Sequence, residues 1–103
     1  MKAKPLALSR VEIAKELKSL KGWKHRSGIL LKTYKFSDFK AAFSFMQAIA
    51  KVANSIDHHP EWKNVYNKVE VELTTHDLGR KVGPLDIKMA HAMEKQFAKH
   101  WKH

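Results

Sequence analysis

The feature that most constrains the fold of this chain is a long, unusually apolar helical pattern from Asp38 to about His58, with Ser37 as its expected N-cap. Its apolar side chains recur at helical spacing in two adjoining rows. The first row holds Phe39, Phe43, Met46, Ala50 and Ala53, and the second holds Ala42, Phe45, Ile49, Val52 and Ile56. A helix that lies on a sheet needs only one such row. The other row is therefore buried either in a wide stripe of the same core or against another subunit.

A shorter helix is predicted near the start of the chain, in the stretch SRVEIAKELKSLKGW. Ser9 and Glu12 have the spacing of a capping box, in which each side chain accepts a hydrogen bond from the backbone of the other residue. Apolar residues recur behind them at helical spacing: Ile13, Leu17 and Leu20. Gly22 is placed to supply the left-handed residue that ends a helix.

Two regions have the patterns of β-strands. Residues 23–26 and 29–36 are expected to form a hairpin across Ser27 and Gly28, because glycine adopts positive φ without steric cost. The stretch NKVEVELTT alternates most regularly. One face carries Val69, Val71 and Leu73, and the other carries Lys68, Glu70, Glu72 and Thr74.

A last helix is expected from Pro84 to about Lys99. Pro84 suits its first position, and Asp86 falls in its first turn, where a carboxylate meets the positive end of the helix dipole. The order helix, strand, strand, helix, strand, helix predicts a small α+β domain, with helices packed on one face of an antiparallel sheet. No repeat or linker divides it, so we expect a single domain over residues 1–103.

Composition narrows the function classes. The formal net charge is +10, but the 20 Lys and Arg residues are spread along the chain and only three are Arg. This favours a solvated basic surface over a nucleic-acid-binding stripe, which stays an alternative that a salt-dependent gel shift would test. Absence of Cys excludes disulfides. No apolar run approaches the roughly 20 residues that span a bilayer, and the first residues lack the apolar segment of a signal peptide. We therefore expect a cytoplasmic protein that does not bind membranes.

The stretch DHHPEW places two titratable rings, His58 and His59, next to each other. Pro60 disfavours helical geometry at the residue before it, so the long helix is expected to end near His58. The break allows the two rings to face one space. Asn54 lies one turn behind His58 on the same face, and His76 follows the VELTT strand.

Histidine titrates around pH 6.5, so three such rings at one pocket suit general acid–base catalysis. Two other interpretations are open. Three histidines can hold a catalytic zinc ion, although adjacent histidines chelate awkwardly and no supporting carboxylate motif is present. The pair can also be structural, resting on Trp62 at the helix end.

The spacing of the residues from His58 to Asp86 resembles the signature of the pterin-4a-carbinolamine dehydratases. His58, His59 and Pro60 are followed by Tyr66 after five residues, His76 after nine more and Asp86 after another nine. The block HHPEWKNVYNKVEVELTTHD is similar to that family as a whole. The similarity extends back through GWK and the long helix and forward to the last helix.

This resemblance implies that the chain is a hydro-lyase that dehydrates 4a-hydroxytetrahydropterin to quinonoid dihydropterin, without a metal or an organic cofactor. By position, the three active-site histidines are His58, His59 and His76. Trp23 matches an aromatic residue near the pterin pocket. Asp86 matches the last acid of the signature, although it could instead serve only the helix N-terminus.

One position departs from the family pattern. Four residues before His58 the signature has a charged or titratable residue, commonly Glu, where this chain has Asn54. An amide can hydrogen-bond the pterin or fix a histidine tautomer, but it cannot act as a base. Asp57 could substitute from a neighbouring direction. Asn54, Asp57 and Pro60 are therefore expected, with Trp23 and Asp86, around the substrate.

The resemblance also implies partners. Family members are homo-oligomers, dimers or tetramers, in which the long helices pack together. They regenerate the pterin cofactor after aromatic amino acid hydroxylation, so a hydroxylase is an expected functional companion. Some animal relatives are dimerisation cofactors of a homeodomain transcription factor. A non-catalytic binding protein is therefore an alternative.

Overall fold

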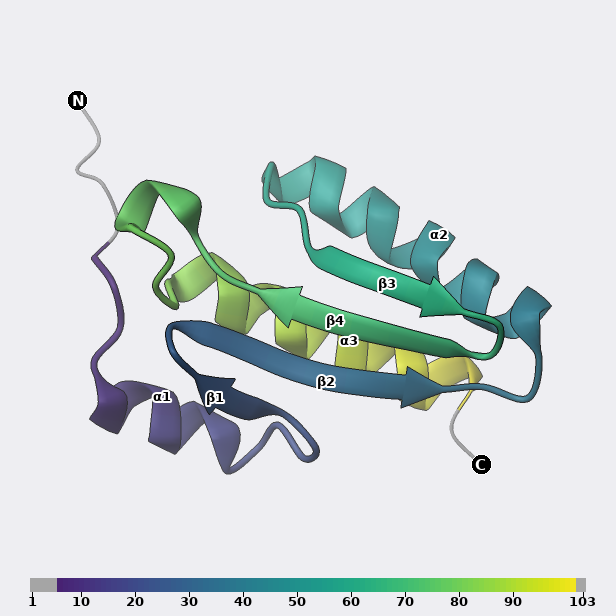
Figure 1. Ribbon diagram of the computed structural model, residues 1–103, viewed down its shortest axis with the longest axis horizontal. Helices are drawn as coiled ribbons and strands as arrows, with labels where there is room; N and C mark the ends of the chain where they lie inside the picture. The colour runs from purple at the N-terminus through teal and green to yellow at the C-terminus, as the bar shows by residue number, and fades with distance from the viewer. Residues whose placement is uncertain (1–5, 102–103) are drawn as a thin grey trace.

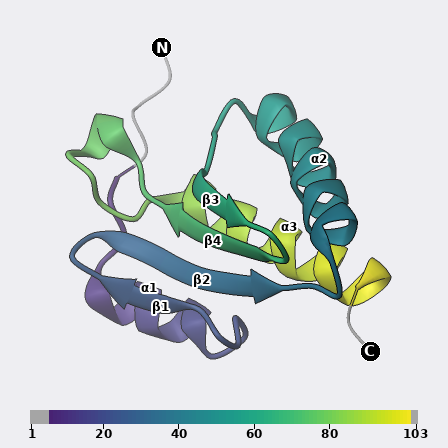
Figure 2. The ribbon, with the colours of Figure 1, turned by 45° about the vertical axis from the view of Figure 1, so that its right-hand side comes forward.

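The computed structural model describes residues 6–101 as one four-stranded antiparallel sheet, with strands in the order β1-β2-β4-β3. The elements are α1 (Arg10–Leu17), β1 (Lys24–Arg26), β2 (Ile29–Lys35), α2 (Phe39–Ile56), β3 (Glu61–Val65), β4 (Lys68–Leu73), the 3₁₀ turn η1 (His76–Leu78) and α3 (Pro84–His100). Helices α2 and α3 pack against each other and both contact β4. Figure 1 shows α3 running behind the strands, and Figure 2 shows α2 beside them. The predicted α+β class is confirmed.

The predicted capping box at the start of α1 is confirmed. Ser9 N–H donates to Glu12 Oε1 at 2.9 Å, and Glu12 N–H donates to Ser9 Oγ at 3.1 Å. The hydrogen bond from the Ser9 backbone to the Glu12 carboxylate and, after it, a hydrogen bond with the Ser9 side chain lower the pKa of Glu12. The helix ends at Leu17, so Gly22 is not its terminal residue. Gly22 does have a positive φ of 85°, but in the turn that leads to β1.

The predicted hairpin of β1 and β2 is also confirmed. Arg26 pairs with Ile29, and the two residues between them, Ser27 and Gly28, have φ values of 50° and 78°. Gly28 lies against the loop after η1, where a Cβ would be only 2.2 Å from the carbonyl oxygen of Arg80. The hairpin turn therefore has no room for a side chain at this position.

Helix α2 begins one residue later than predicted. Asp38, not Ser37, is the N-cap, because its Oδ1 accepts a hydrogen bond from Ala41 N–H at 2.8 Å. This is the usual way in which Asp satisfies a free amide of the first turn.

The two apolar rows of α2 have different surroundings. The core of this chain buries Ala42, Phe45 and Ile49 of the second row, together with Ala53 at the end of the first row. Phe39 and Phe43 of the other row are 47% and 46% exposed, and their rings stack with centroids 5.7 Å apart. Burial of a wide apolar stripe in the core of this chain alone therefore does not account for Phe39 and Phe43.

The structure contains one strand that the sequence reading left out. β3 pairs with β4 along its whole length, from Glu61 opposite Glu72 to Val65 opposite Lys68. In β4 the predicted inward face is confirmed, since Val69, Val71 and Leu73 are all buried. Thr74 was expected on the outward face, which is wrong. The strand ends at Leu73, and the buried Thr74 hydroxyl donates to the Gly28 carbonyl at 2.8 Å.

The core is centred on aromatic rings between the sheet and α2 and α3. Tyr34 packs against Phe45 and Phe97 with centroid distances of 4.8 and 5.0 Å, and Phe36 packs against the same two rings. Ala53 near the end of α2, Leu73 at the end of β4 and Ile87 near the start of α3 belong to the same buried cluster, and the site lies where these segments meet. Between residues 6 and 101, no helix is both long enough and apolar enough to cross a membrane.

Candidate functional site

The end of α2 places His58 and His59. Asp57 adopts the left-handed conformation, with φ 52° and ψ 46°, which Asp tolerates better than most residues. The amide of His58 then donates to the carbonyl of Ala53 at 3.0 Å, which closes the last turn. The helix ends at Ile56, two residues before the predicted end, and Asp57 rather than Pro60 turns the chain.

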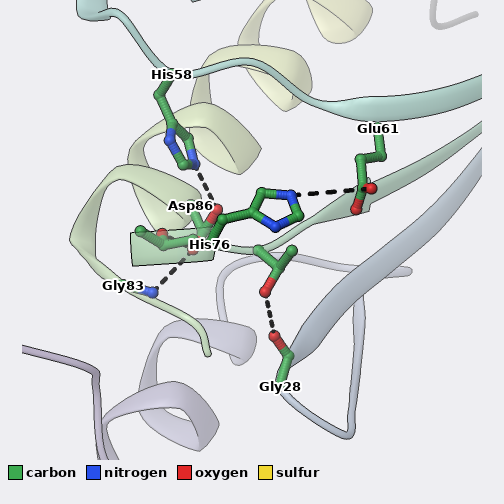
Figure 3. A network of polar contacts seen from close by, with 8 residues as sticks. Gly28, His58, Glu61, His76, Gly83 and Asp86 are labelled. Atoms are coloured by element: carbon green, nitrogen blue, oxygen red, sulfur yellow. Dashed lines mark hydrogen bonds and ion pairs between the residues drawn. The ribbon is translucent and has the colours of Figure 1, made fainter. Parts of the chain in front are cut away.

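The structure brings the three predicted histidines around one open pocket of about 250 Å³. It is lined by Asp57, His58, His59, Thr74, Thr75, His76 and Asp77. His58 and His59 come from the segment after α2, and His76 begins η1. Figure 3 shows the His58 ring above Asp86 and the His76 ring beside it towards Glu61, although the two histidines are 18 positions apart in the sequence.

His58 is held by a buried carboxylate. Its Nε2 lies 2.6 Å from Asp86 Oδ1, and the Asp86 side chain is fully buried while that of His58 is 11% exposed. An ionised carboxylate only accepts hydrogen bonds, so Nε2 carries the proton that His58 donates. Nδ1 is then the ring nitrogen whose lone pair can exchange a proton with a bound molecule. Such carboxylate–histidine pairs fix the tautomer and stabilise the imidazolium ion.

Asp86 also serves the start of α3. Its Oδ2 accepts hydrogen bonds from Gly83 N–H at 2.8 Å and from Thr75 Oγ1 at 2.7 Å. The two interpretations of Asp86, as a helix-terminal residue and as a site acid, are therefore both compatible with its contacts. One carboxylate joins the N-terminus of α3 to a histidine of the pocket.

His59 has a different partner. Its Nε2 lies 3.0 Å from Oδ1 of Asn54, one turn back on α2, and both residues are exposed. The amide oxygen can only accept, so His59 also donates from Nε2 and leaves Nδ1 available. Asp57 lines the pocket beside the two rings, whereas the half-buried Pro60 continues the chain towards β3 and is not among the lining residues.

His76 lies at the exposed edge of the pocket, with 63% of its side chain accessible. Its Nε2 is 4.0 Å from Glu61 Oε1, and the other oxygen of Glu61 is 3.6 Å from Arg80 Nη2. These distances describe loose surface ion pairs rather than hydrogen bonds. His76 is therefore the least restrained of the three rings.

Trp23 lies elsewhere in the single chain. It is buried, and its Nε1–H donates to Glu94 Oε2 at 3.3 Å. The same oxygen accepts from Lys32 Nζ at 2.6 Å and from the Tyr34 hydroxyl. Burial is the main cause that raises the pKa of Tyr34, and the hydrogen bond of its hydroxyl to Glu94 raises that pKa further. Trp23 is not among the residues that line the histidine pocket, so its contact with a pterin stays a prediction.

A larger hollow of about 390 Å³ lies over the sheet and contains no histidine. Its lining is Gly22, Lys24, Leu31, Lys32, Thr33, Glu70, Val71 and Glu72. Its ionisable side chains are lysines and glutamates, residue types that are less suited than histidine to exchange protons near neutral pH. The smaller histidine pocket is therefore the better candidate for proton transfer. Within residues 6–101, no group of three or more His, Asp or Glu side chains is arranged to hold a metal ion.

Two residues of the site carry no clear signal in the sequence: Thr75, which contacts Asp86, and Glu61, which contacts His76. Thr75 is the second threonine of the TTH triplet, and nothing in its spacing distinguishes it from Thr74. Glu61 would have been recognised as a neighbour of His76 only if β3 had been predicted. The register of that strand brings Glu61 opposite Glu72, close to the end of β4.

Comparison with known proteins identifies the family. Residues 6–96 match the sequence model described as pterin 4 alpha carbinolamine dehydratase. A protein of Opitutus terrae named as a pterin-4-alpha-carbinolamine dehydratase is 45% identical over 91 residues, 88% of this chain and 94% of that protein. One from Rhizobium etli with the same name is 46% identical over 94 residues, 89% of this chain and 92% of its own.

A solved structure gives the same result. The crystal structure of a transcriptional coactivator/pterin dehydratase from Brucella melitensis has a TM-score of 0.82 and 42% sequence identity to this chain. The match covers 86% of this chain and 96% of that one. The family model, the relatives and the fold agree, and the chain belongs to the pterin-4a-carbinolamine dehydratase family of hydro-lyases.

Proposed function

We propose that this protein dehydrates a 4a-hydroxytetrahydropterin to the quinonoid dihydropterin and water, using His58, His59 and His76 for proton transfer. The observation that carries the proposal is the 2.6 Å contact between His58 and the fully buried Asp86 at the wall of the histidine pocket. A ring oriented in this way has one nitrogen committed to the carboxylate and the other free to exchange a proton.

The elimination needs two proton transfers. One proton goes to the 4a-hydroxyl, which leaves as water when the bond between C4a and oxygen breaks. The proton on N5 is removed, and its electron pair forms the double bond between N5 and C4a. We assign removal of the N5 proton to Nδ1 of His58, because Asp86 stabilises the imidazolium ion that results.

Protonation of the departing hydroxyl is assigned to His59. Its partner is the neutral amide of Asn54, which orients the ring but stabilises its charged form less than a carboxylate would. This contact leaves His59 without the carboxylate partner that suits His58 to the role of base. His76, at the open edge, is assigned to substrate orientation and to proton exchange with solvent.

We propose that these steps need neither a metal nor an organic cofactor, and that the pterin is the substrate. Nε2 of His58 already has a hydrogen-bond partner in Asp86, and Nε2 of His59 has one in Asn54. An imidazole can serve as both acid and base near neutral pH. The pterin itself supplies the conjugated system that is formed.

The experiment that tests the function is a stopped-flow dehydration assay with synthetic 4a-hydroxytetrahydropterin, in which the rate without protein is subtracted. The protein should accelerate dehydration, and extensive dialysis against a chelator should leave the rate unchanged. No acceleration at micromolar protein would contradict the proposed activity. Loss of activity on chelation, restored by a metal, would contradict metal-free catalysis.

We also propose that the protein self-associates through α2. The stacked rings of Phe39 and Phe43 are nearly half exposed, on a helix that already buries Ala42, Phe45 and Ile49 in the core of its own chain. A second copy of the same helix has a matching apolar row, as a two-fold symmetric interface requires. Sedimentation equilibrium on the purified chain tests this proposal, and a monomer mass would contradict it.

A further inference from the structure

Thr75 connects the pair of His58 and Asp86 to the loop that carries His76, although it is not one of the signature residues. It lies between the end of β4 and His76. Its hydroxyl donates to Asp86 Oδ2 at 2.7 Å, and the other oxygen of that carboxylate receives His58 Nε2 at 2.6 Å. A chain of two hydrogen bonds thus runs from Thr75 through a buried carboxylate to a ring of the pocket.

The Thr75 hydroxyl helps to fix the orientation of the Asp86 carboxylate. Oδ2 receives two donors, Thr75 Oγ1 and the Gly83 amide at 2.8 Å, which leaves Oδ1 directed at His58. Because Asp86 is fully buried, lost hydrogen bonds are not readily replaced by water. Without the hydroxyl, the carboxylate would be held at Oδ2 by the Gly83 amide alone.

The backbone of Thr75 holds the loop that presents His76. Its N–H donates to the Lys81 carbonyl at 3.0 Å, and its own carbonyl accepts from Leu78 N–H at 3.1 Å and from Arg80 N–H at 3.2 Å. Threonine at the start of a helical turn often caps that turn with its hydroxyl. Here it makes no such bond to η1, and the hydroxyl is directed to Asp86 instead.

The surroundings of Gly83 also restrict the space around the hydroxyl. A Cβ at Gly83 would lie 3.2 Å from Thr75 Oγ1 and 2.8 Å from Leu78 Cδ1. Glycine at this position therefore lets the threonine hydroxyl and the α3 N-terminus approach the same carboxylate oxygen.

We infer that Thr75 is a positioning residue of the acid–base site: its hydroxyl orients Asp86 so that His58 keeps its proton on Nε2 and offers Nδ1 to the substrate. The inference rests on the proposed function for its catalytic consequence. The effect on the His58 ring does not depend on any activity and can be measured without substrate.

The test compares Thr75→Val, which keeps the shape and removes the hydroxyl, with Thr75→Ser, which keeps the hydroxyl. Thr75→Val should lower kcat by roughly 10- to 100-fold with a smaller change in KM, as expected for loss of a hydrogen bond to a buried charged group. Thr75→Ser should restore kcat to within a few-fold of the parent.

The second readout is the ¹⁵N spectrum of the His58 ring. Parent and Thr75→Ser should show a protonated Nε2 with slowed proton exchange, and Thr75→Val should show faster exchange and a shifted Nε2 signal.

Thr74→Val is the matched control. It removes a neighbouring buried hydroxyl that bonds Gly28 rather than Asp86, so it should lower the melting temperature without altering the His58 signal.

The outcomes separate the two proposals. An active parent with unchanged kcat and unchanged His58 signal in Thr75→Val overturns the role of Thr75 and leaves the proposed function standing. An inactive parent overturns the proposed function, while the spectra still decide whether Thr75 controls the ring. If Thr75→Val does not fold, Thr75→Ala makes the same comparison, because the smaller side chain cannot overpack the site. The same spectra and the same criteria then apply.

Discussion

Two adjacent histidines with different hydrogen-bond partners form the residue-scale basis of the site. His58 is paired with a buried carboxylate, and His59 is paired with an exposed amide. An ionised partner stabilises an imidazolium ion more strongly than an amide does. Neighbouring rings of the same type can therefore perform different parts of one elimination, one accepting a proton and the other donating it.

Asn54→Glu should change the behaviour of His59. Asn54 contacts the His59 ring at 3.0 Å, and a carboxylate near this place would stabilise the protonated ring. The proton-donating form of His59 would then persist to higher pH. We expect a higher turnover or an upward shift of the pH optimum, measured as the pH profile of kcat.

Gln47→Glu is the control for this change, since it adds the same charge at an exposed position of α2 about two turns from Asn54. It should leave the pH profile unchanged. If Asn54→Glu also leaves the profile unchanged, the partner of His59 has no influence on the reaction.

At the scale of elements, the sequence predicted those whose signals are local. The capping box of α1, the Ser27-Gly28 hairpin and the alternation of Val69, Val71 and Leu73 are all found in the structure. β3 was missed because its inward positions are Trp62 and the polar Asn64, which leaves no row of aliphatic side chains.

The turn between β3 and β4 also lacks the usual sequence signal. Tyr66 has a φ of 51°, a conformation that favours Gly or Asn, and Asn64 stabilises it by donating to the carbonyls of Tyr66 and Lys68. The site likewise depends on contacts between segments that are distant in the sequence. The spacing of histidines suggested a common pocket, but the contact of Thr75 with Asp86 depends on how η1 packs beside α3.

The close approach of the hairpin turn to the loop after η1 gives a prediction about stability. Gly28→Ala would place a Cβ 2.2 Å from the Arg80 carbonyl oxygen, at a residue with φ 78°. Backbone strain and overpacking together should lower the free energy of unfolding by about 2–5 kcal/mol. The measurement is the urea unfolding midpoint.

Gly79→Ala is the matched control. Its φ of 74° is almost the same, but no atom lies within 4 Å of the added Cβ. It should lower the free energy of unfolding by only the strain of a left-handed residue, about 1–2 kcal/mol. Equal losses in the two variants would mean that the contact with Arg80 does not restrict the turn.

At the scale of the whole molecule, α2 has two functions in this account. One apolar row holds the helix on the sheet and so fixes the segment that carries His58 and His59. In the other row, Phe39 and Phe43 remain exposed on the single chain. The same helix therefore connects the position of the site to a surface that suits self-association.

Replacing both exposed rings, Phe39→Lys with Phe43→Lys, should reduce the mass of the particle in sedimentation equilibrium, because the apolar row would become charged. Val11→Lys is the control, since Val11 is 79% exposed on α1, away from this surface. It should leave the mass unchanged. An unchanged mass in the double variant would show that α2 does not mediate association.

The most direct test of the central claim is the dehydration rate of His58→Ala, His59→Ala and His76→Ala beside the parent, with folding confirmed by melting temperature. If these rings transfer the protons, His58→Ala and His59→Ala should each lower kcat by about 10²–10⁴-fold, the usual contribution of a positioned acid or base. His76→Ala should have a smaller effect, because its ring is 63% exposed and has only a loose ion pair with Glu61. Dehydration by His58→Ala and His59→Ala at the parent rate would contradict the account.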